Sequence, residues 1–128
     1  MRTGSFSVTH GGKTADGSIV QLPGPAGGLE SNVRRWMEQA GLTQLDDDAM
    51  RTFLKSQKRI RTRDGFEGVL IDLASQLGGN MTQENSILAV LIEAKEETIF
   101  VKLTGPRTVL LQNLGALAEL SASLAMAD

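Results

Sequence analysis

The residue types best suited to binding stand together where a glycine-rich loop runs into an amphipathic segment. Gly27 and Gly28 end the loop, and Asn32, Arg35 and Trp36 follow on the next segment. Backbone N–H groups of such a loop, together with the N-terminus of a helix, can hold an anion. Arg and aromatic side chains are frequent anchors of binding surfaces. We therefore predict a binding site here, in which Asn32 and Arg35 form the rim of a groove and Trp36 is half-buried.

A structural interpretation of these residues stays open. Glycine and proline form tight turns more often than phosphate sites, and the loop lacks the spacing of a P-loop or a dinucleotide fingerprint. A large aromatic side chain on an apolar helix face usually belongs to the core, and Arg35 could serve an ion-pair or hydrogen-bond network. Lys102 completes the candidate binding residues, because it alternates with apolar neighbours and could be a solitary buried amine. Its alternative is a side chain that extends to the margin of a sheet.

Catalysis and metal binding lack the residues that they require. The sequence contains no Cys and one His, which excludes thiolate catalysis, disulfides and Cys-based zinc sites. That residue, His10, lies in a glycine-rich turn. The aspartates at 46–48 are contiguous, whereas a calcium loop needs alternate ligands and a glycine, so we assign them to helix capping. We predict no catalytic residues, no metal ligands and no cofactor, and hence no enzyme.

A basic segment at 51–63 is the alternative binding surface, for a polyanion or nucleic acid. Alternation on an edge strand would divide its side chains between two faces, and nearby aspartates offset their field. The chain has 13 Lys and Arg against 15 Asp and Glu, a net charge of −2, and so exerts no overall attraction on nucleic acid. A solvated edge is therefore favoured over nucleic-acid binding. The basic residues are Arg51, Lys55, Lys58, Arg59, Arg61 and Arg63.

Period-two alternation predicts two N-terminal strands. The first contains Phe6 and Val8, and the second spans 18–22. The polar, glycine-rich stretch 10–17 between them is expected to be a hairpin loop.

Two helices are predicted to follow. Prolines and glycines at 23–28 end regular structure, and the segment 29–40 then repeats its apolar residues at helical spacing. Gly41 supplies the stop of that helix. Asp46 is the expected N-cap of a second helix that continues to Leu54.

The central part of the chain predicts a sheet. The basic run 58–63 suits an edge strand, because charge there discourages strand addition by another chain. The runs 66–73 and 87–94 are apolar at both parities and should lie mid-sheet, with a loop at 76–85 between them. A tight turn leads to another strand at 98–104.

The C-terminal segment predicts one helix that opens with Pro106 at its first helical position. Because an interior glycine costs roughly 1 kcal/mol relative to alanine, Gly115 indicates close contact with the helix's own sheet or with another chain. The second possibility makes this helix a candidate homo-oligomer surface. The core stripe is Leu110, Leu114 and Leu117, and the neighbouring row of small residues is Gly115, Ala118 and Ala122.

Together these elements predict an α+β fold, a mostly antiparallel β-sheet with helices packed on it. The 128 residues suit a single domain over 1–128, and the composition, 41% hydrophobic and 22% charged, is that of a folded, water-soluble unit. No stretch is apolar enough for a signal peptide or a transmembrane segment.

Two stretches carry a family resemblance. They are Leu-Pro-Gly-Pro-Ala-Gly-Gly at 22–28, followed by Asn-Val-Arg-Arg-Trp-Met-Glu-Gln-Ala-Gly-Leu at 32–42, and Phe-Val-Lys-Leu-Thr-Gly-Pro at 100–106. On these motifs most of the chain resembles a group of small, uncharacterised bacterial proteins that are often exported lipoproteins. That group resembles the fold of PsbP, the extrinsic photosystem subunit. The resemblance implies a PsbP-like α/β/α sandwich and a non-enzymatic accessory role.

The resemblance also implies a location in the periplasm or cell envelope. In the family, a signal segment and a short lead-in strand usually precede the position that Met1 occupies here, so Met1 as the true start would imply the cytoplasm. The basic run 58–63 and the long loop 76–85 also depart from the family pattern. We therefore predict a non-catalytic accessory or binding module of a bacterial envelope or multi-protein assembly, with an unidentified protein partner.

Overall fold

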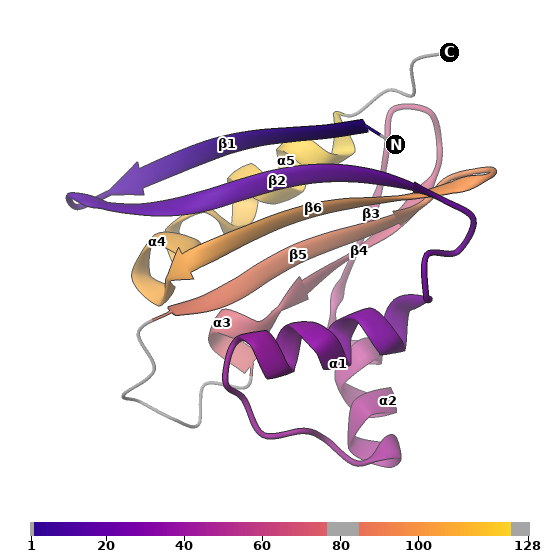
Figure 1. Cartoon of the computed structure of the whole chain (residues 1–128), viewed down its shortest axis with the longest axis horizontal. Coiled ribbons are helices and arrows are strands. Elements are labelled where there is room, and N and C mark those ends of the chain that lie inside the picture. The colour runs from indigo at the N-terminus through magenta and orange to yellow at the C-terminus, as the bar shows by residue number, and fades with distance from the viewer. Residues whose placement is uncertain (1, 77–84, 124–128) are drawn as a thin grey trace.

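The computed structural model describes residues 2–76 and 85–123 of the chain, and the strands in this part form one antiparallel sheet (Figure 1). Their order across the sheet is β1-β2-β6-β5-β4-β3, so β1 and β3 are the two edges. The predicted α+β class with an antiparallel sheet is confirmed. The strands are β1 (Arg2–His10), β2 (Lys13–Pro23), β3 (Lys58–Arg61), β4 (Glu67–Asp72), β5 (Asn85–Glu93) and β6 (Glu97–Pro106).

Helices cover both faces of the sheet (Figure 1). Helices α1 (Leu29–Gln39) and α2 (Asp47–Ser56) pack on one side, which we call the α1 face, and share a core with Ile71, Ala89 and Phe100. Helices α4 (Arg107–Gln112) and α5 (Leu114–Ala122) pack on the opposite side, the α4 face, and share a core with Leu88 and Val101. The short helix α3 (Leu73–Gln76) follows β4. Strands β4 and β5 are therefore buried on both faces, as their apolar runs predicted.

The first hairpin has longer strands and a tighter turn than we predicted. The expected loop at 10–17 is wrong, because β1 continues to His10 and β2 starts at Lys13. Gly11 and Gly12 form the turn with φ of 59° and 79°, and positive φ at both central residues is what a type I′ turn requires. The polar residues at 13–16 misled the prediction because this end of β2 is largely exposed and carries little apolar alternation.

The two helices on the α1 face form where their patterns predicted. In α1, Val33, Trp36 and Met37 are buried, and Gly41 follows its end with φ 72°. Asp46 caps α2, since its Oδ1 accepts a hydrogen bond from the Ala49 N–H at 2.8 Å. The predicted caps and buried faces of both helices are therefore confirmed.

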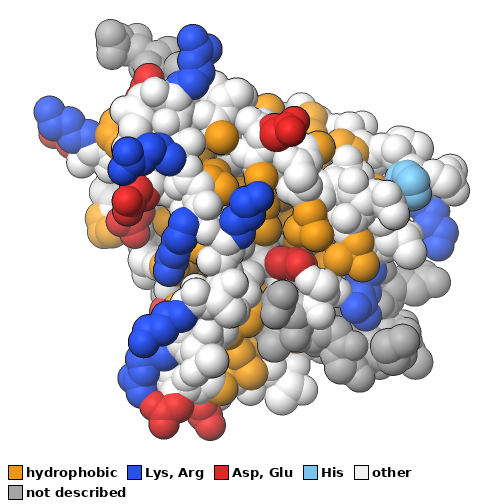
Figure 2. All heavy atoms as spheres, turned by 180° about the vertical axis from the view of Figure 1, so that it is seen from behind, with side chains coloured by type: hydrophobic (Ala, Val, Ile, Leu, Met, Phe, Trp, Pro, Cys, Tyr) orange, Lys and Arg blue, Asp and Glu red, His pale blue; other side chains and the backbone are white. Residues whose placement is uncertain are grey.

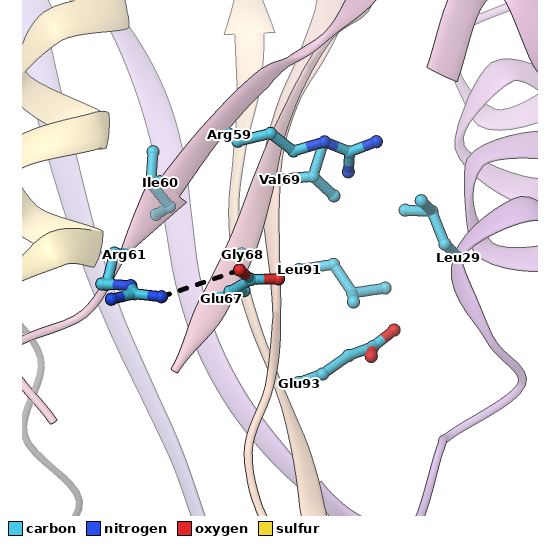
Figure 3. Close-up of a pocket in the computed structure, with 9 residues that line it drawn as sticks. All are labelled: Leu29, Arg59, Ile60, Arg61, Glu67, Gly68, Val69, Leu91 and Glu93. Carbon is cyan, nitrogen blue, oxygen red and sulfur yellow. Dashed lines mark ion pairs between the residues drawn. The ribbon is translucent and has the colours of Figure 1, made fainter. Parts of the chain in front are cut away.

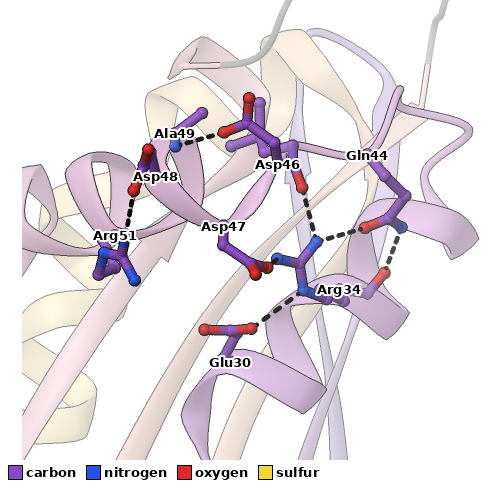
Figure 4. Close-up of polar contacts among 9 residues, drawn as sticks. Glu30, Arg34, Gln44, Asp46, Asp47, Asp48, Ala49 and Arg51 are labelled. Carbon is purple, nitrogen blue, oxygen red and sulfur yellow. Dashed lines mark hydrogen bonds and ion pairs between the residues drawn. The ribbon is translucent and has the colours of Figure 1, made fainter.

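The connection between α1 and α2 is held by Arg34 (Figure 4). Its guanidinium pairs with Glu30 within α1 and with Asp47 at the start of α2, each at 3.2 Å. It also donates to the Leu45 carbonyl at 2.7 Å, and Gln44 Nε2 donates back to the Arg34 carbonyl at 2.9 Å. The guanidinium thus fixes α2 against α1 and is fully engaged in structure.

The C-terminal segment differs from the prediction in three ways. Asn113 interrupts the single helix expected there, because its φ of −111° and ψ of 11° are not helical and its Nδ2 donates to the Val109 carbonyl at 2.8 Å. Pro106 is the N-cap of α4, one residue before the helix begins. The close contact of Gly115 with the helix's own sheet is absent, since a Cβ at that position would meet nothing within 4 Å among the described residues.

The segment after β4 was predicted in part. The strand ends at Asp72, whose Oδ1 accepts from the Ser75 N–H at 2.9 Å and so caps α3, a helix that we did not predict. The loop expected at 76–85 lies mostly outside the described residues.

Candidate binding surface

The glycine-rich loop is tied down by the side chain of Asn32. That side chain is 1% exposed, and its Nδ2 donates to the carbonyls of Ala26 at 3.0 Å and of Gly28 at 2.6 Å. Gly27 and Gly28 have φ of 93° and 79°, which glycine adopts without strain. The Gly28 N–H donates to the Pro25 carbonyl at 3.0 Å and is not free to hold an anion. The loop and Asn32 therefore have the structural role that was the alternative interpretation.

Trp36 belongs to the core. It is 2% exposed and meets the ring of Phe100 edge to face, with ring centroids 6.0 Å apart and planes at 84°. The expected groove with a half-buried Trp36 is therefore wrong. The large apolar ring follows the buried face of α1, on which Val33 and Met37 also lie.

Arg35 and Lys102 are brought together above this core. Arg35 is exposed, and its Nη2 donates to Asn32 Oδ1 at 2.6 Å. Lys102, which is half-buried on β6, donates from Nζ to Gln39 Oε1 at 2.6 Å. Within residues 2–76 and 85–123 neither cation has a carboxylate within 4.0 Å. Sequence reasoning missed Gln39, although its spacing of four residues from Arg35 places both on one side of α1.

The strands beside this pair present hydroxyl groups. The register aligns Ser5 with Ser18 and Ser18 with Lys102, so these side chains form one row on the α1 face. Asp16 lies on the next row with Ser7 and Thr104, and its carboxylate is exposed. We call the set Arg35, Gln39, Lys102, Ser18 and Ser5 the polar surface. It offers two cations and several hydrogen-bond donors to an anionic group.

The amine of Lys102 is expected to lose its proton at a lower pH than exposed lysines. Burial lowers its pKa first, and the nearby Arg35 cation lowers it further. Because the folded pKa lies below the unfolded value of 10.5, the folded state binds fewer protons in the window between them. Between the two pKa values the free energy of unfolding rises with pH. Below the folded pKa the amine is charged in both states, and its unfavourable contribution to stability does not change with pH. Titration of the lysine Cε resonances by NMR measures this directly.

Two variants separate the causes of this shift. Arg35→Gln should raise the pKa of Lys102 part of the way, because burial remains, whereas Arg51→Gln on α2 should leave it unchanged. If Lys102 titrates together with the exposed lysines in the unmodified protein, the assigned burial and charge coupling are wrong.

A second feature of the α1 face is a hollow of about 460 Å³ between the start of α1 and strands β3–β5 (Figure 3). Its floor is Val69 and Leu91, and Leu29 stands opposite. Arg59 and Glu93 reach toward the hollow in Figure 3, whereas Arg61 pairs with Glu67 at 3.8 Å. Sequence reasoning did not find this hollow, because three strands and a distant helix form it. The lining is Leu29, Arg59, Ile60, Arg61, Glu67, Gly68, Val69, Leu91 and Glu93.

The basic segment does not form one positive surface. On β3, Lys58 and Ile60 share one face while Arg59 and Arg61 share the other. Arg51 is paired with Asp48 within α2. Seen from behind in Figure 2, Lys and Arg side chains along the edge where α2 and β3 lie are interspersed with Asp and Glu. This distribution agrees with the predicted solvated edge strand.

Residues 2–76 and 85–123 contain no group of three or more His, Cys, Asp or Glu side chains that could hold a metal ion. No helix in these ranges is long and apolar enough to cross a membrane.

Comparison with known proteins supports the fold alone. No protein-family model matches the chain, and no curated protein matches it. It is similar to the crystal structure of PA94 from Pseudomonas aeruginosa, a protein of unknown function described as a candidate regulator. The TM-score is 0.59 at 19% identity, and the match covers 99% of this chain and 84% of PA94. At that identity the two proteins share a fold, and a shared fold does not carry an activity.

Proposed function

We propose that this protein is a non-catalytic binding module that uses the polar surface to contact acidic side chains of a protein partner. The observation that carries this proposal is that Arg35 and Lys102, two positively charged side chains, lie near each other on the α1 face. The amine of Lys102 bonds to Gln39, which lies one helical turn from Arg35 on α1, and within the described residues no carboxylate lies within 4.0 Å of either cation. A carboxylate that bridged both would relieve their repulsion and accept charge-assisted hydrogen bonds.

The positions of these cations are fixed before any partner binds. Asn32 holds the guanidinium of Arg35, and Gln39 holds the amine of Lys102. Asn32 and Gln39 both lie on α1. The position of this helix is fixed by the buried Trp36 and by the hydrogen bond from Arg34 to the Leu45 carbonyl. Fixed charges lose little conformational entropy on binding, which favours recognition of a partner.

The proposed cellular role of this module is based on the family resemblance. Similarity to small exported lipoproteins supports an accessory role in a bacterial envelope or multi-protein assembly. The alternative of a polyanion-binding domain has less support, because the basic side chains of β3 are divided between two faces, and Arg51 and Arg61 are paired with acids.

Affinity capture from cells that make the protein tests the proposal. We expect the double variant Arg35→Gln, Lys102→Gln to lose the bound partner, because both cations contribute to one contact. The matched control is Arg51→Gln, Lys95→Gln, which removes the same charge at exposed positions elsewhere and should keep the partner. Recovery of the same proteins with both variants would overturn the assigned surface.

A further inference from the structure

The two edges of the sheet are protected very differently. Strand β3 has four residues, and three of them are basic, which is how natural sheets prevent strand addition. Strand β1 has nine residues, with no charge or proline between Thr3 and Thr9. Its register with β2 runs without a bulge from Arg2 to His10. In Figure 1, β1 lies along the outside of the sheet with β2 on one side. Strand β1 therefore lacks the protective features found at β3.

The backbone groups that β1 leaves unpaired can be assigned. The Gly24 N–H donates to the Glu96 carbonyl at 2.9 Å, so even-numbered residues of β2 and β6 direct their backbone groups at each other. Odd-numbered residues of β2 then face β1, where Gly17 meets Phe6. Even-numbered residues of β1 are thus bonded to β2. The outward groups belong to Thr3, Ser5, Ser7 and Thr9.

We infer that β1 is a dimerisation strand that pairs with β1 of a second copy of this chain, antiparallel about a two-fold axis at Phe6. This register places Ser5 opposite Ser7 of the second copy and Thr3 opposite Thr9 of the second copy. All four residues with outward backbone groups then meet each other, and each such pair exchanges two hydrogen bonds. Pairing about an axis between two residues would set outward groups against groups already bonded to β2, and an axis at Ser5 or Ser7 would leave Thr9 or Thr3 without a partner among these four residues.

The side chains also favour this self-pairing. On the α1 face, Ser5 would lie opposite Ser7 of the second copy, where the two hydroxyl groups can share a cross-strand hydrogen bond. On the α4 face, Phe6 lies over Gly17 and is half-buried, so it retains a surface for its symmetry mate. Aromatic cross-strand pairs stabilise a sheet relative to alanine pairs. Since the net charge is −2, two copies repel each other only weakly.

This inference goes beyond the proposed function and can fail without it. It replaces the C-terminal helix with β1 as the contact between copies. The two polar surfaces would then lie on the same face of one continuous sheet, on either side of the paired β1 strands.

Crosslinking tests the register, because the chain contains no cysteine. Residues of a non-hydrogen-bonded antiparallel pair have Cα atoms about 4.5 Å apart, within the range that a disulfide bridges. We expect Phe6→Cys to form a disulfide-linked dimer of twice 13.7 kDa on mild oxidation. The control, Thr14→Cys, lies on the same hairpin but on the inner strand, and should remain uncrosslinked.

Ser7→Pro tests the edge independently by light scattering after size exclusion, with circular dichroism to confirm folding. Its N–H points away from β2, so proline there keeps the hairpin but removes a bond between copies. We expect the dissociation constant of the dimer to rise at least about tenfold. A wild-type monomer at micromolar concentration, a folded Ser7→Pro dimer of unchanged stability, or equal crosslinking of Thr14→Cys would each overturn the inference. If Ser7→Pro does not fold, the crosslinking comparison decides.

Discussion

Replacing Trp36 by alanine should lower the free energy of unfolding by about 3–5 kcal/mol, because a large buried side chain leaves a cavity that the structure cannot fill. The indole is 2% exposed and packs edge to face on Phe100, where α1 meets the middle of the sheet. Denaturant unfolding followed by circular dichroism measures the loss, since the variant has no tryptophan to report by fluorescence.

Trp36→Phe is the matched variant for this prediction. It keeps an aromatic ring in the same core, so the decrease in the free energy of unfolding should be clearly smaller than for Trp36→Ala. A change below about 1 kcal/mol for Trp36→Ala would mean that the α1 face is not closed as described. The size of the expected loss also makes Trp36 unsuitable for binding experiments, which should use Arg35 instead.

Gly105→Ala should cost about 2–3 kcal/mol through overpacking. A Cβ at Gly105 would lie 2.7 Å from both the Cα and the Cβ of Ala15, so the backbones of β6 and β2 would have to separate. Because Ala15 is completely buried, the main chain cannot move into solvent. Thermal or denaturant unfolding measures the effect.

Gly115→Ala is the control, because it is the same substitution in open space. Among residues 2–76 and 85–123, a Cβ there would meet nothing within 4 Å, and Gly115 is the second residue of α5. Alanine should therefore stabilise the protein by about 0.5–1 kcal/mol. Equal effects of the two substitutions would contradict the close approach of β6 to β2 at Gly105.

Asn32, Trp36 and Gly105 lie in the two motifs that carry the family resemblance, and each has a structural role. Asn32 holds the glycine-rich loop, Trp36 fills the core and Gly105 allows two strands to approach. Each has a structural reason to be in its motif. The motifs therefore carry information about the fold, and the polar surface depends on Arg35 and Lys102, whose meeting no motif predicts.

The sequence predicted the elements whose pattern arises from burial. Strand β5 is apolar at both parities because helices cover both sheet faces, and α1 shows helical spacing because one side is buried. The sequence pattern was less informative in segments that are exposed to solvent. The start of β2 is polar and was taken for a loop, and the break at Asn113 depends on one side chain that bonds to its own helix.

The sequence identified individual residues of the candidate site but not which of them lie together. Arg35 and Lys102 were both identified as binding residues, but their proximity depends on how α1 lies across β6. The hollow above Val69 and Leu91 depends in the same way on four separate elements. Long-range packing of this kind leaves no local pattern in the residues that it brings together.

Acylation of the Lys102 amine, compared between the purified protein and the cells that make it, tests most directly whether the polar surface is a contact surface. Mass spectrometry would report the rate at Lys102 relative to Lys13, an exposed amine on the first hairpin. We expect Lys102 to react several-fold more slowly in cells, where the acidic partner covers it, and Lys13 to react equally in both. An unchanged rate at Lys102 would contradict the proposed surface.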